Sequence, residues 1–295
     1  MGVWDEGQAC RVVIGLRASA PVEASVDAAA TLAAVFQTEL IGVFAKEEGI
    51  VDFAGLPFAQ AVSFGAGQIR QLSRDVMVQA LARSEMACRR AVSVRAERAR
   101  VKWSFTLESG DVQGSLETIL ASGDILVLSG EGQGLGARGL LEAIRAAPHG
   151  ARGVVVAARE AWRGVDAGER LSGRSRKPVQ APVIVIARDG PEADEACRLA
   201  ARISAFTGEP MALLAIAASD QEAARIVERG RNAAGDRATP SVYRFQPGHA
   251  QWIAATLSAL GPSFVVADLQ GEPFDDDRSA LCLLRAARAP VVLLR

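Results

Sequence analysis

The sequence is poor in cysteine, and its few cysteines are not paired. Cys10, Cys88, Cys197 and Cys282 lie far apart, and no two have the Cys-x-x-Cys spacing of a redox motif or a zinc ribbon. Such a pattern excludes a disulfide scaffold of the kind found in small secreted domains. We expect four reduced thiols, three of them on helices.

Histidine is scarcer still, with only His149 and His249 in the chain. Neither lies near a second histidine or a carboxylate pair at metal-ligand spacing. No Gly-x-Ser-x-Gly elbow accompanies them, so a Ser-His-Asp set is not readable. We interpret both as surface turn residues, and the sequence predicts no metal site and no catalytic residues.

Long apolar runs and an excess of charge are also missing. The chain has 295 residues and a formal net charge of -1, and 49% of its residues are hydrophobic. No stretch reaches the roughly 20 apolar residues of a membrane span, and the first ten residues do not resemble a signal peptide. The chain has no excess of positive charge that would attract nucleic acid. We expect a cytoplasmic protein with a large core that binds neither membrane nor nucleic acid.

What the sequence does contain is an alternation of buried strands and helices. The run RVVIGL at 11–16 is typical of a strand that is buried on both faces. Apolar residues then recur at helical spacing, with Pro21 in the first turn and Ser19 as a candidate cap. A second strand, LIGVFA, follows at 40–45, and this β-α-β order implies a right-handed crossover in a parallel sheet.

The remaining elements of this first copy follow the same order. We expect a long polar helix over about 69–100 and a strand at 101–107. A further helix begins near Asp111, and strands follow at 124–129 and 153–158.

The pattern restarts at residue 181, which indicates an internal repeat. The second copy repeats the strand at 181–190, a helix that Gly208 ends, and strands at 210–217, 241–246 and 263–270 before APVVLLR. The predicted fold class is α/β, with two tandem doubly wound parallel five-stranded sheets. The predicted domains are 1–158 and a shorter one at 181–295, joined by a linker at 159–180 that is rich in glycine, serine and charge.

One segment of the first copy, residues 48–75, has no counterpart in the second. It carries Phe53, Leu56, Phe58 and Phe64 among glycines and follows the second strand at the carboxyl end of the sheet. One interpretation is a lid or interface patch, because long loops in compact domains are usually functional or disordered. The other is an elaborated loop whose aromatic residues simply pack on the sheet.

Three stretches carry a resemblance to a known family. They are SGDVQGSLETI at 109–119, RAAPHGARGVVVAAR at 145–159 and RAARAPVVLLR at 285–295. Together with the strand order of both copies, they resemble the tandem form of the universal stress protein family over nearly the whole chain. The resemblance implies the UspA-like fold. It also implies that the last strands of the two copies, which are natural edge strands, pair antiparallel and form a pseudo-dimer within one chain.

The resemblance also implies where a nucleotide would bind. ATP-binding members have an aspartate after the first strand and a loop that reads Gly, two residues, Gly, nine residues, Gly, then Ser or Thr. Glycines let the backbone approach phosphates, and the helix that follows presents free N–H groups to the anion. In the first copy, five glycines follow the fourth strand: Gly130, Gly132, Gly134, Gly136 and Gly139.

The first copy keeps these glycines but departs from the motif. With Gly132 and Gly139 as the second and third glycines, only six residues separate them, and Leu140 replaces the hydroxyl residue. Ser19 ends the Arg-Ala-Ser stretch that stands at the aspartate position. Gly134, Gly136 and Gly139 also match Gly-x-Gly-x-x-Gly, but after the fourth strand, where a dinucleotide fingerprint is weak evidence.

The second copy departs in the opposite way. Asp189 follows its first strand as the motif requires, but the loop after its fourth strand reads GEPFDDDRSA. Asp275, Asp276 and Asp277 crowd the expected helix start, where carboxylates satisfy the helix N-terminus themselves and repel phosphate. The sequence therefore predicts degenerate nucleotide sites in both copies.

Three functions remain open from the sequence. The first is a non-enzymatic stress-response protein that acts through protein partners or self-association. The second is a regulatory switch that binds ATP or another adenine nucleotide through the first copy. The third is a slow nucleotide hydrolase or transferase. The missing Ser or Thr after Gly139 and the missing Walker lysine both weigh against it.

Overall fold

The computed structural model describes residues 10–18, 22–46, 48–56, 60–62, 69–71, 73–110, 112–129, 144–145, 147, 151–157, 181–235 and 240–295. In the first half of the chain, the strands are β1 (Val12–Leu16), β2 (Leu40–Lys46), β3 (Gln60–Val62), β4 (Ile69–Gln71), β5 (Trp103–Ser109), β6 (Ile125–Ser129) and β7 (Gly153–Ala157). Its helices are α1 (Glu23–Phe36), α2 (Glu48–Ala54), α3 (Arg74–Ala99) and α4 (Val112–Ile119).

The second half repeats this order with fewer elements. Its strands are β8 (Val183–Ala187), β9 (Met211–Ile216), β10 (Ser241–Phe245), β11 (Phe264–Asp268) and β12 (Val291–Leu294). Its helices are α6 (Pro191–Thr207), α7 (Asp220–Ala234), α8 (Ala250–Leu260) and α9 (Asp277–Ala287). Among the helices that the structure describes, none is long and apolar enough to cross a membrane.

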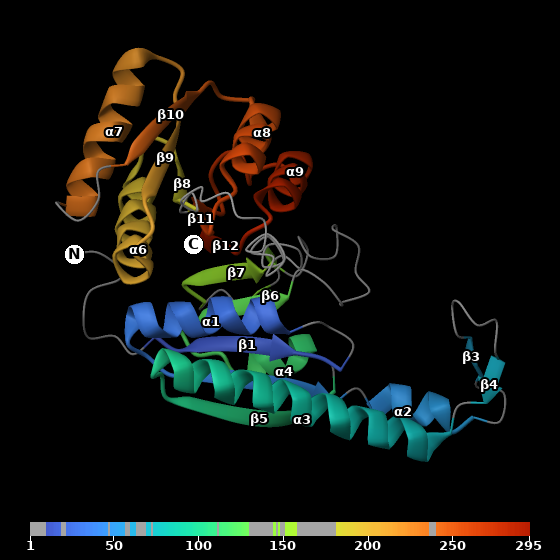
Figure 1. Ribbon diagram of the computed structural model, residues 1–295. Coiled ribbons are helices and arrows are strands. Elements are labelled where there is room, and N and C mark those ends of the chain that lie inside the picture. The colour runs from blue at the N-terminus through green and yellow to red at the C-terminus, as the bar shows by residue number, and fades with distance from the viewer. Residues whose placement is uncertain are drawn as a thin grey trace, which may run out of the picture.

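Ten of the strands form one continuous sheet (Figure 1). Its order is β10-β9-β8-β11-β12-β7-β6-β1-β2-β5, so each half contributes five parallel strands in the same relative order. The two halves meet where β12 pairs antiparallel with β7, with Val292 opposite Val155. The expected α/β fold and the antiparallel pairing of the two last strands are therefore confirmed, and the two predicted sheets form a single one.

Helices cover both faces of this sheet, as the apolar runs of the strands require. One core packs the strands against α1, α3, α6 and α7, and the other packs them against α4, α8 and α9. The halves also touch through their helices, since Arg202 of α6 donates to the Val35 carbonyl of α1 at 3.2 Å. The same guanidinium lies 5.1 Å from the centre of the Phe36 ring.

Two local expectations about helix ends have different outcomes. α1 begins at Glu23 with Val22 at the N-cap position and no side-chain cap, so Ser19 as its cap is wrong. The N-cap position falls on Val22, whose side chain has no acceptor for the free N–H groups of the first turn. The stop at Gly208 is confirmed, because this residue ends α6 in the left-handed conformation with φ 74°.

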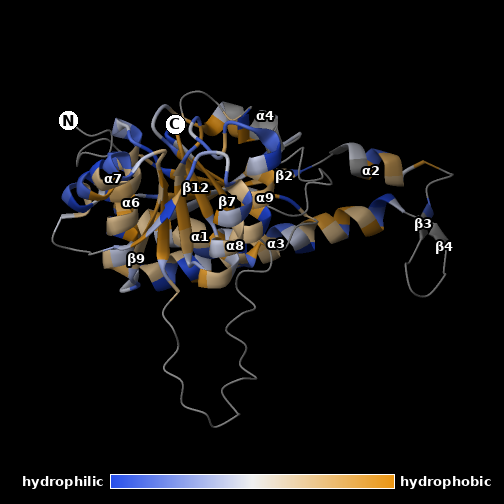
Figure 2. Cartoon of the chain, turned by 90° about the horizontal axis from the view of Figure 1, so that it is seen from above, coloured by the Kyte–Doolittle hydropathy of each residue, from blue (hydrophilic) through white to orange (hydrophobic). Residues whose placement is uncertain are grey.

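The 48–75 segment contains structure that the sequence did not reveal. It begins with α2, and its described residues include β3 and β4, which pair antiparallel in a small sheet of their own. The long helix starts at Arg74 rather than near 69, because Ser73 caps it by accepting a hydrogen bond from Val76 N–H. Figure 2 shows α2, β3 and β4 extending away from the main sheet beside the first turns of α3. Phe53 is half exposed there, whereas Phe58 and Phe64 lie outside the described residues.

Candidate functional site

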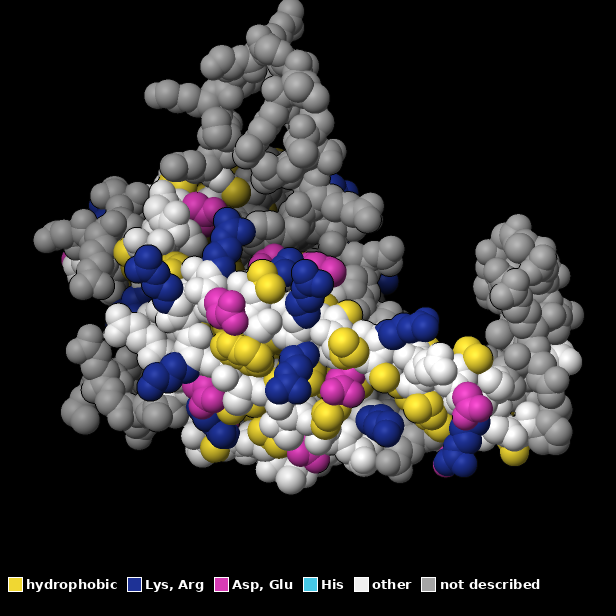
Figure 3. All heavy atoms as spheres, turned by 60° about the horizontal axis from the view of Figure 1, so that its bottom comes forward, with side chains coloured by type: hydrophobic (Ala, Val, Ile, Leu, Met, Phe, Trp, Pro, Cys, Tyr) yellow, Lys and Arg dark blue, Asp and Glu magenta, His cyan; other side chains and the backbone are white. Residues whose placement is uncertain are grey.

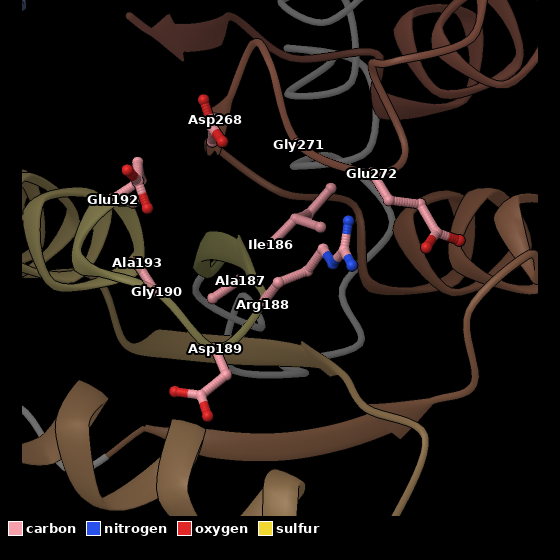
Figure 4. A pocket seen from close by; sticks show the side chains of 11 residues that line it. Ile186, Ala187, Arg188, Asp189, Gly190, Glu192, Ala193, Asp268, Gly271 and Glu272 are labelled. Carbon is pink, nitrogen blue, oxygen red and sulfur yellow. The ribbon is translucent and has the colours of Figure 1, made fainter.

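A cleft of about 160 Å³ lies at the carboxyl ends of β8 and β11 in the second half. These strands are neighbours, yet β9 continues the sheet on the far side of β8 and β12 continues it on the far side of β11. The strand order therefore reverses between them, which is where doubly wound sheets bind ligands. The turn after β8, the first turn of α6 and residues 268–272 line the cleft (Figure 4).

Carboxylates dominate this cleft. Glu192, Asp268 and Glu272 line it, and Arg188 is the one cation among its lining residues. Burial raises the pKa of Asp268, whose carboxylate accepts a hydrogen bond from Gln270 N–H at 3.0 Å. Glu272 accepts one from Gly248 N–H at the turn before α8. The charge of the cleft is therefore unfavourable for a phosphate.

Asp189, the residue expected to meet an adenosine, follows β8 directly, but its carboxylate is held by α7. Arg225 donates to it at 2.9 Å and Arg229 at 3.3 Å. These contacts, chiefly the hydrogen bond from Arg225, lower the pKa of Asp189. Figure 4 shows its carboxylate pointing away from Asp268 and Glu272. The sequence thus located Asp189 at the cleft but could not show its pairing with α7.

The N-terminus of α9, where the family motif would place phosphates, carries its own carboxylate. Asp276 is the N-cap and accepts hydrogen bonds from Arg278 N–H and Ser279 N–H, both at 3.0 Å. Asp277 forms an ion pair at 2.6 Å with Arg145 of the first half. The expectation that aspartates satisfy this helix N-terminus is confirmed, because the N–H groups that a phosphate would need are already bonded.

The candidate site residues of the first half lie outside the described part of the chain. β1 and β6 are neighbours there, so the first half has the same reversal of strand order. Ser19 follows β1, and Gly130, Gly132, Gly134, Gly136 and Gly139 follow the end of β6 at Ser129. All of them lie outside the described residues. A nucleotide site in this half stays a prediction.

Within the described residues, no three His, Cys, Asp or Glu side chains are grouped so that they could hold a metal ion. His249 is at the N-cap position of α8 without a side-chain cap bond, and His149 lies outside the described part. All four cysteines are free, and Cys88, Cys197 and Cys282 are on helices as expected.

Replacing Asp276 by alanine tests whether this carboxylate caps α9. We expect the melting temperature to fall at neutral pH by on the order of 2 °C, because two backbone N–H groups lose their acceptor. Hydrogen bonds from Ser279 and Arg278 lower the pKa of Asp276 below its ordinary value of 3.8. The cap therefore stabilises the fold above that value, and its contribution is lost as the pH falls through the lowered pKa.

The measurement is thermal unfolding of both proteins from pH 7 down to pH 2. Asp275→Ala is the matched control, since Asp275 is exposed and accepts no cap hydrogen bond from the described residues. Equal losses for the two variants, or a difference from wild type that does not shrink in acid, would contradict the capping role.

Comparisons with known proteins agree on the fold. No protein-family model and no curated protein matches the sequence. A universal stress protein from Archaeoglobus fulgidus DSM 4304 aligns over 96% of this chain and 96% of its own, with 12% identity and a TM-score of 0.56. The cytoplasmic domain of a prokaryotic cation chloride cotransporter aligns over 97% of this chain and 95% of its own, with 10% identity and a TM-score of 0.55.

The chain therefore has the α/β fold of the universal stress proteins. At these identities the likeness concerns the fold alone. A domain of a transporter shares it almost equally well, so the fold does not fix an activity.

The sequence did not single out Glu192, Asp268 and Glu272 as cleft residues. The position of each residue in the repeat could have indicated it. Asp268 ends the fourth strand of the second copy, Glu272 is in the loop that follows, and Glu192 is in the first turn of the first helix. Only the three-dimensional placement of these elements brings the carboxylates to one cleft.

Proposed function

We propose that this chain is a non-enzymatic protein of the universal-stress type that acts through protein partners, with nucleotide sites that are degenerate in both halves. The observation that carries the proposal is the carboxylate lining of the switch-point cleft together with the Asp276 cap on α9. Both place negative charge where an ATP-binding relative of this fold would place phosphate.

The size of the electrostatic repulsion and the volume of the cleft both disfavour a nucleotide in the second half. Each carboxylate within about 4 Å of a phosphate opposes binding by roughly 1 to 4 kcal/mol at effective dielectrics of 80 to 20. The cleft volume of about 160 Å³ also lies below the roughly 300–1,000 Å³ of pockets that enclose drug-sized ligands. A nucleotide would have to displace the Asp276 cap and overcome this repulsion together.

The absence of catalysis is part of the proposal and rests on the sequence. The chain has two histidines, no Walker lysine and no nucleophile elbow. The four free thiols support a reducing compartment, so we place the protein in the cytoplasm.

A nucleotide-dependent switch in the first half is the second candidate. The observation that favours it is the position of β6, which ends at Ser129 beside β1, so the glycine stretch begins at the first switch point. Under this alternative, an adenine nucleotide would alter partner binding.

Affinity capture after cross-linking in cells, with the tagged full chain at native expression, tests the proposal. We expect one protein to be recovered in near-stoichiometric amount, with recovery unchanged by millimolar ATP or ADP in the wash. Recovery that depends on ATP would favour the switch instead. Recovery of no specific protein would contradict action through partners.

A further inference from the structure

The helix α3 extends beyond the body of the protein and leaves most of its surface uncovered. It has 26 residues, but only Leu81, Cys88, Val92 and Ala96 are buried, and the last three of these pack in the core. In its first two turns, residues 74–80, no side chain is buried. Burial on one narrow side leaves a long outer face in contact with solvent.

This outer face carries a regular stripe. Its members are exposed and recur with spacings of four, three, four, three and four residues: Val76, Ala80, Arg83, Ala87, Arg90 and Val94. Such spacing places all of them on one side of a helix, roughly opposite the buried residues. It is the a/d spacing by which two helices pack side by side in a coiled coil. Val76 and Val94, at its two ends, are 61% and 49% exposed.

The stripe is also basic. α3 contains six arginines and only three carboxylates, in a chain whose formal net charge is -1. Figure 3 shows dark-blue basic side chains and yellow apolar ones on this face, with magenta carboxylates at several places among them.

Arg83 and Arg90 stand out because nothing on the helix neutralises them. Residues three and four positions away on either side include no Asp or Glu, so neither arginine has an intrahelical ion pair. No carboxylate in the described part of the chain pairs with either one. By contrast, Arg95 pairs with Asp27 of α1 at 2.8 Å, and Arg89 lies 5.7 Å from the Phe105 ring.

We propose that the outer face of α3 binds an acidic amphipathic helix of a protein partner. Ala80 and Ala87 allow close approach of a second helix, the two valines supply apolar contact, and Arg83 and Arg90 select carboxylates. The proposal rests on the proposed function and specifies the surface and the partner chemistry through which the protein acts.

The positive charge of the stripe favours an acidic partner helix over a second copy of this chain. In a parallel pair of α3 helices, Arg83 and Arg90 would face their own copies. In an antiparallel pair centred on residue 85, Arg83 of one helix would lie within one turn of Arg90 of the other. Both arrangements place four arginines together without a carboxylate, which is destabilising. An acidic helix would instead place carboxylates beside Arg83 and Arg90, so that the two helices attract each other.

A designed pair of peptides tests the proposal on the full-length protein. Both are 24-residue fluorescein-labelled helices with Leu and Ala at the a and d positions, and they carry either Glu or Lys at e and g. Binding is measured by fluorescence anisotropy. The variant Arg83→Glu with Arg90→Glu reverses the stripe's charge. Arg231→Glu, at an exposed site on α7, is the matched control.

We expect wild type and the Arg231→Glu control to bind the Glu peptide about tenfold more tightly than the Lys peptide. The double variant should reverse that preference. A variant that keeps both arginines but carries Val76→Ser and Val94→Ser should bind the Glu peptide more weakly than wild type does. Circular dichroism and melting temperature confirm that each variant is folded. All substituted positions are exposed, so folding should be retained.

Several results would overturn the proposal. One is that wild type binds the two peptides equally well, and another is that the double variant keeps the preference of wild type. A third is that the protein binds 24-base-pair DNA or phosphatidylglycerol vesicles and shows no preference between the peptides. In cells, a cross-linked partner that the double variant captures as well as wild type overturns this surface assignment while the proposed function stands. Recovery of no partner overturns the proposed function itself.

Discussion

Asp124→Ala is expected to lower the free energy of unfolding by about 2 to 4 kcal/mol, because a buried carboxylate that accepts several hydrogen bonds is lost. The Asp124 side chain is 1% exposed and lies just before β6. It accepts hydrogen bonds from the Arg11 backbone N–H at 3.0 Å, from the Arg11 guanidinium at 2.6 Å and from Ala121 N–H at 2.8 Å. Its removal leaves several donors without an acceptor at the start of the two central strands of the first half.

The second half provides the matched control for this prediction. Ser263 stands at the same place before β11, and its buried hydroxyl makes no hydrogen bond to any described residue. Ser263→Ala should therefore leave the stability within about 1 kcal/mol of wild type. Urea denaturation followed by circular dichroism measures both variants. A loss of under 1 kcal/mol for Asp124→Ala, or an equal loss for Ser263→Ala, would contradict the structural role of the pair.

Val292→Asp is expected to separate the two halves of the sheet and to cost about 3 kcal/mol or more. Val292 is 1% exposed and lies opposite Val155, which is fully buried, in the antiparallel junction of β12 and β7. A carboxylate there would be buried without a partner. We expect the unfolding transition to broaden or split and the radius of gyration from small-angle scattering to increase.

Val242→Asp is the control for this junction. Val242 is also a strand valine, but it is 40% exposed on β10 at the edge of the sheet, so its replacement should change stability by about 1 kcal/mol or less. If both variants unfold like wild type, the junction does not hold the halves together. If both variants lose the same amount of stability, the effect reflects loss of β propensity rather than burial at the junction.

The central strands could be predicted from the sequence because they are buried on both faces, whereas the edge strands β5 and β10 are partly exposed. The run at 11–16 became β1 at Val12–Leu16, and the repeat at 181–190 became β8 at Val183–Ala187. A run of β-branched residues between turn signals has few alternatives to a central strand. Recognising the repeat then predicted the parallel order within each half and the antiparallel junction between them.

The rest depended on contacts between distant segments. Nothing in the sequence near Asp189 indicates that Arg225 and Arg229 hold its carboxylate, because α7 begins 31 positions later. The short elements α2, β3 and β4 lack a clear period, so the 48–75 segment read only as a loop. α3 was expected to be a polar helix, and its outer stripe became visible only when the structure showed which of its sides is buried.

The nucleotide content of the purified protein distinguishes a chain with degenerate nucleotide sites from one with a working site. Freshly purified full-length protein is denatured, and the supernatant is resolved by ion-exchange chromatography against adenine nucleotide standards. The same batch is then titrated calorimetrically with ATP and magnesium. We expect no released nucleotide and no saturable heat up to about 1 mM ATP, a limit that corresponds to a binding free energy of roughly -4 kcal/mol. Release of about one adenine nucleotide per chain would contradict this expectation and would make the glycine stretch of the first half a working site.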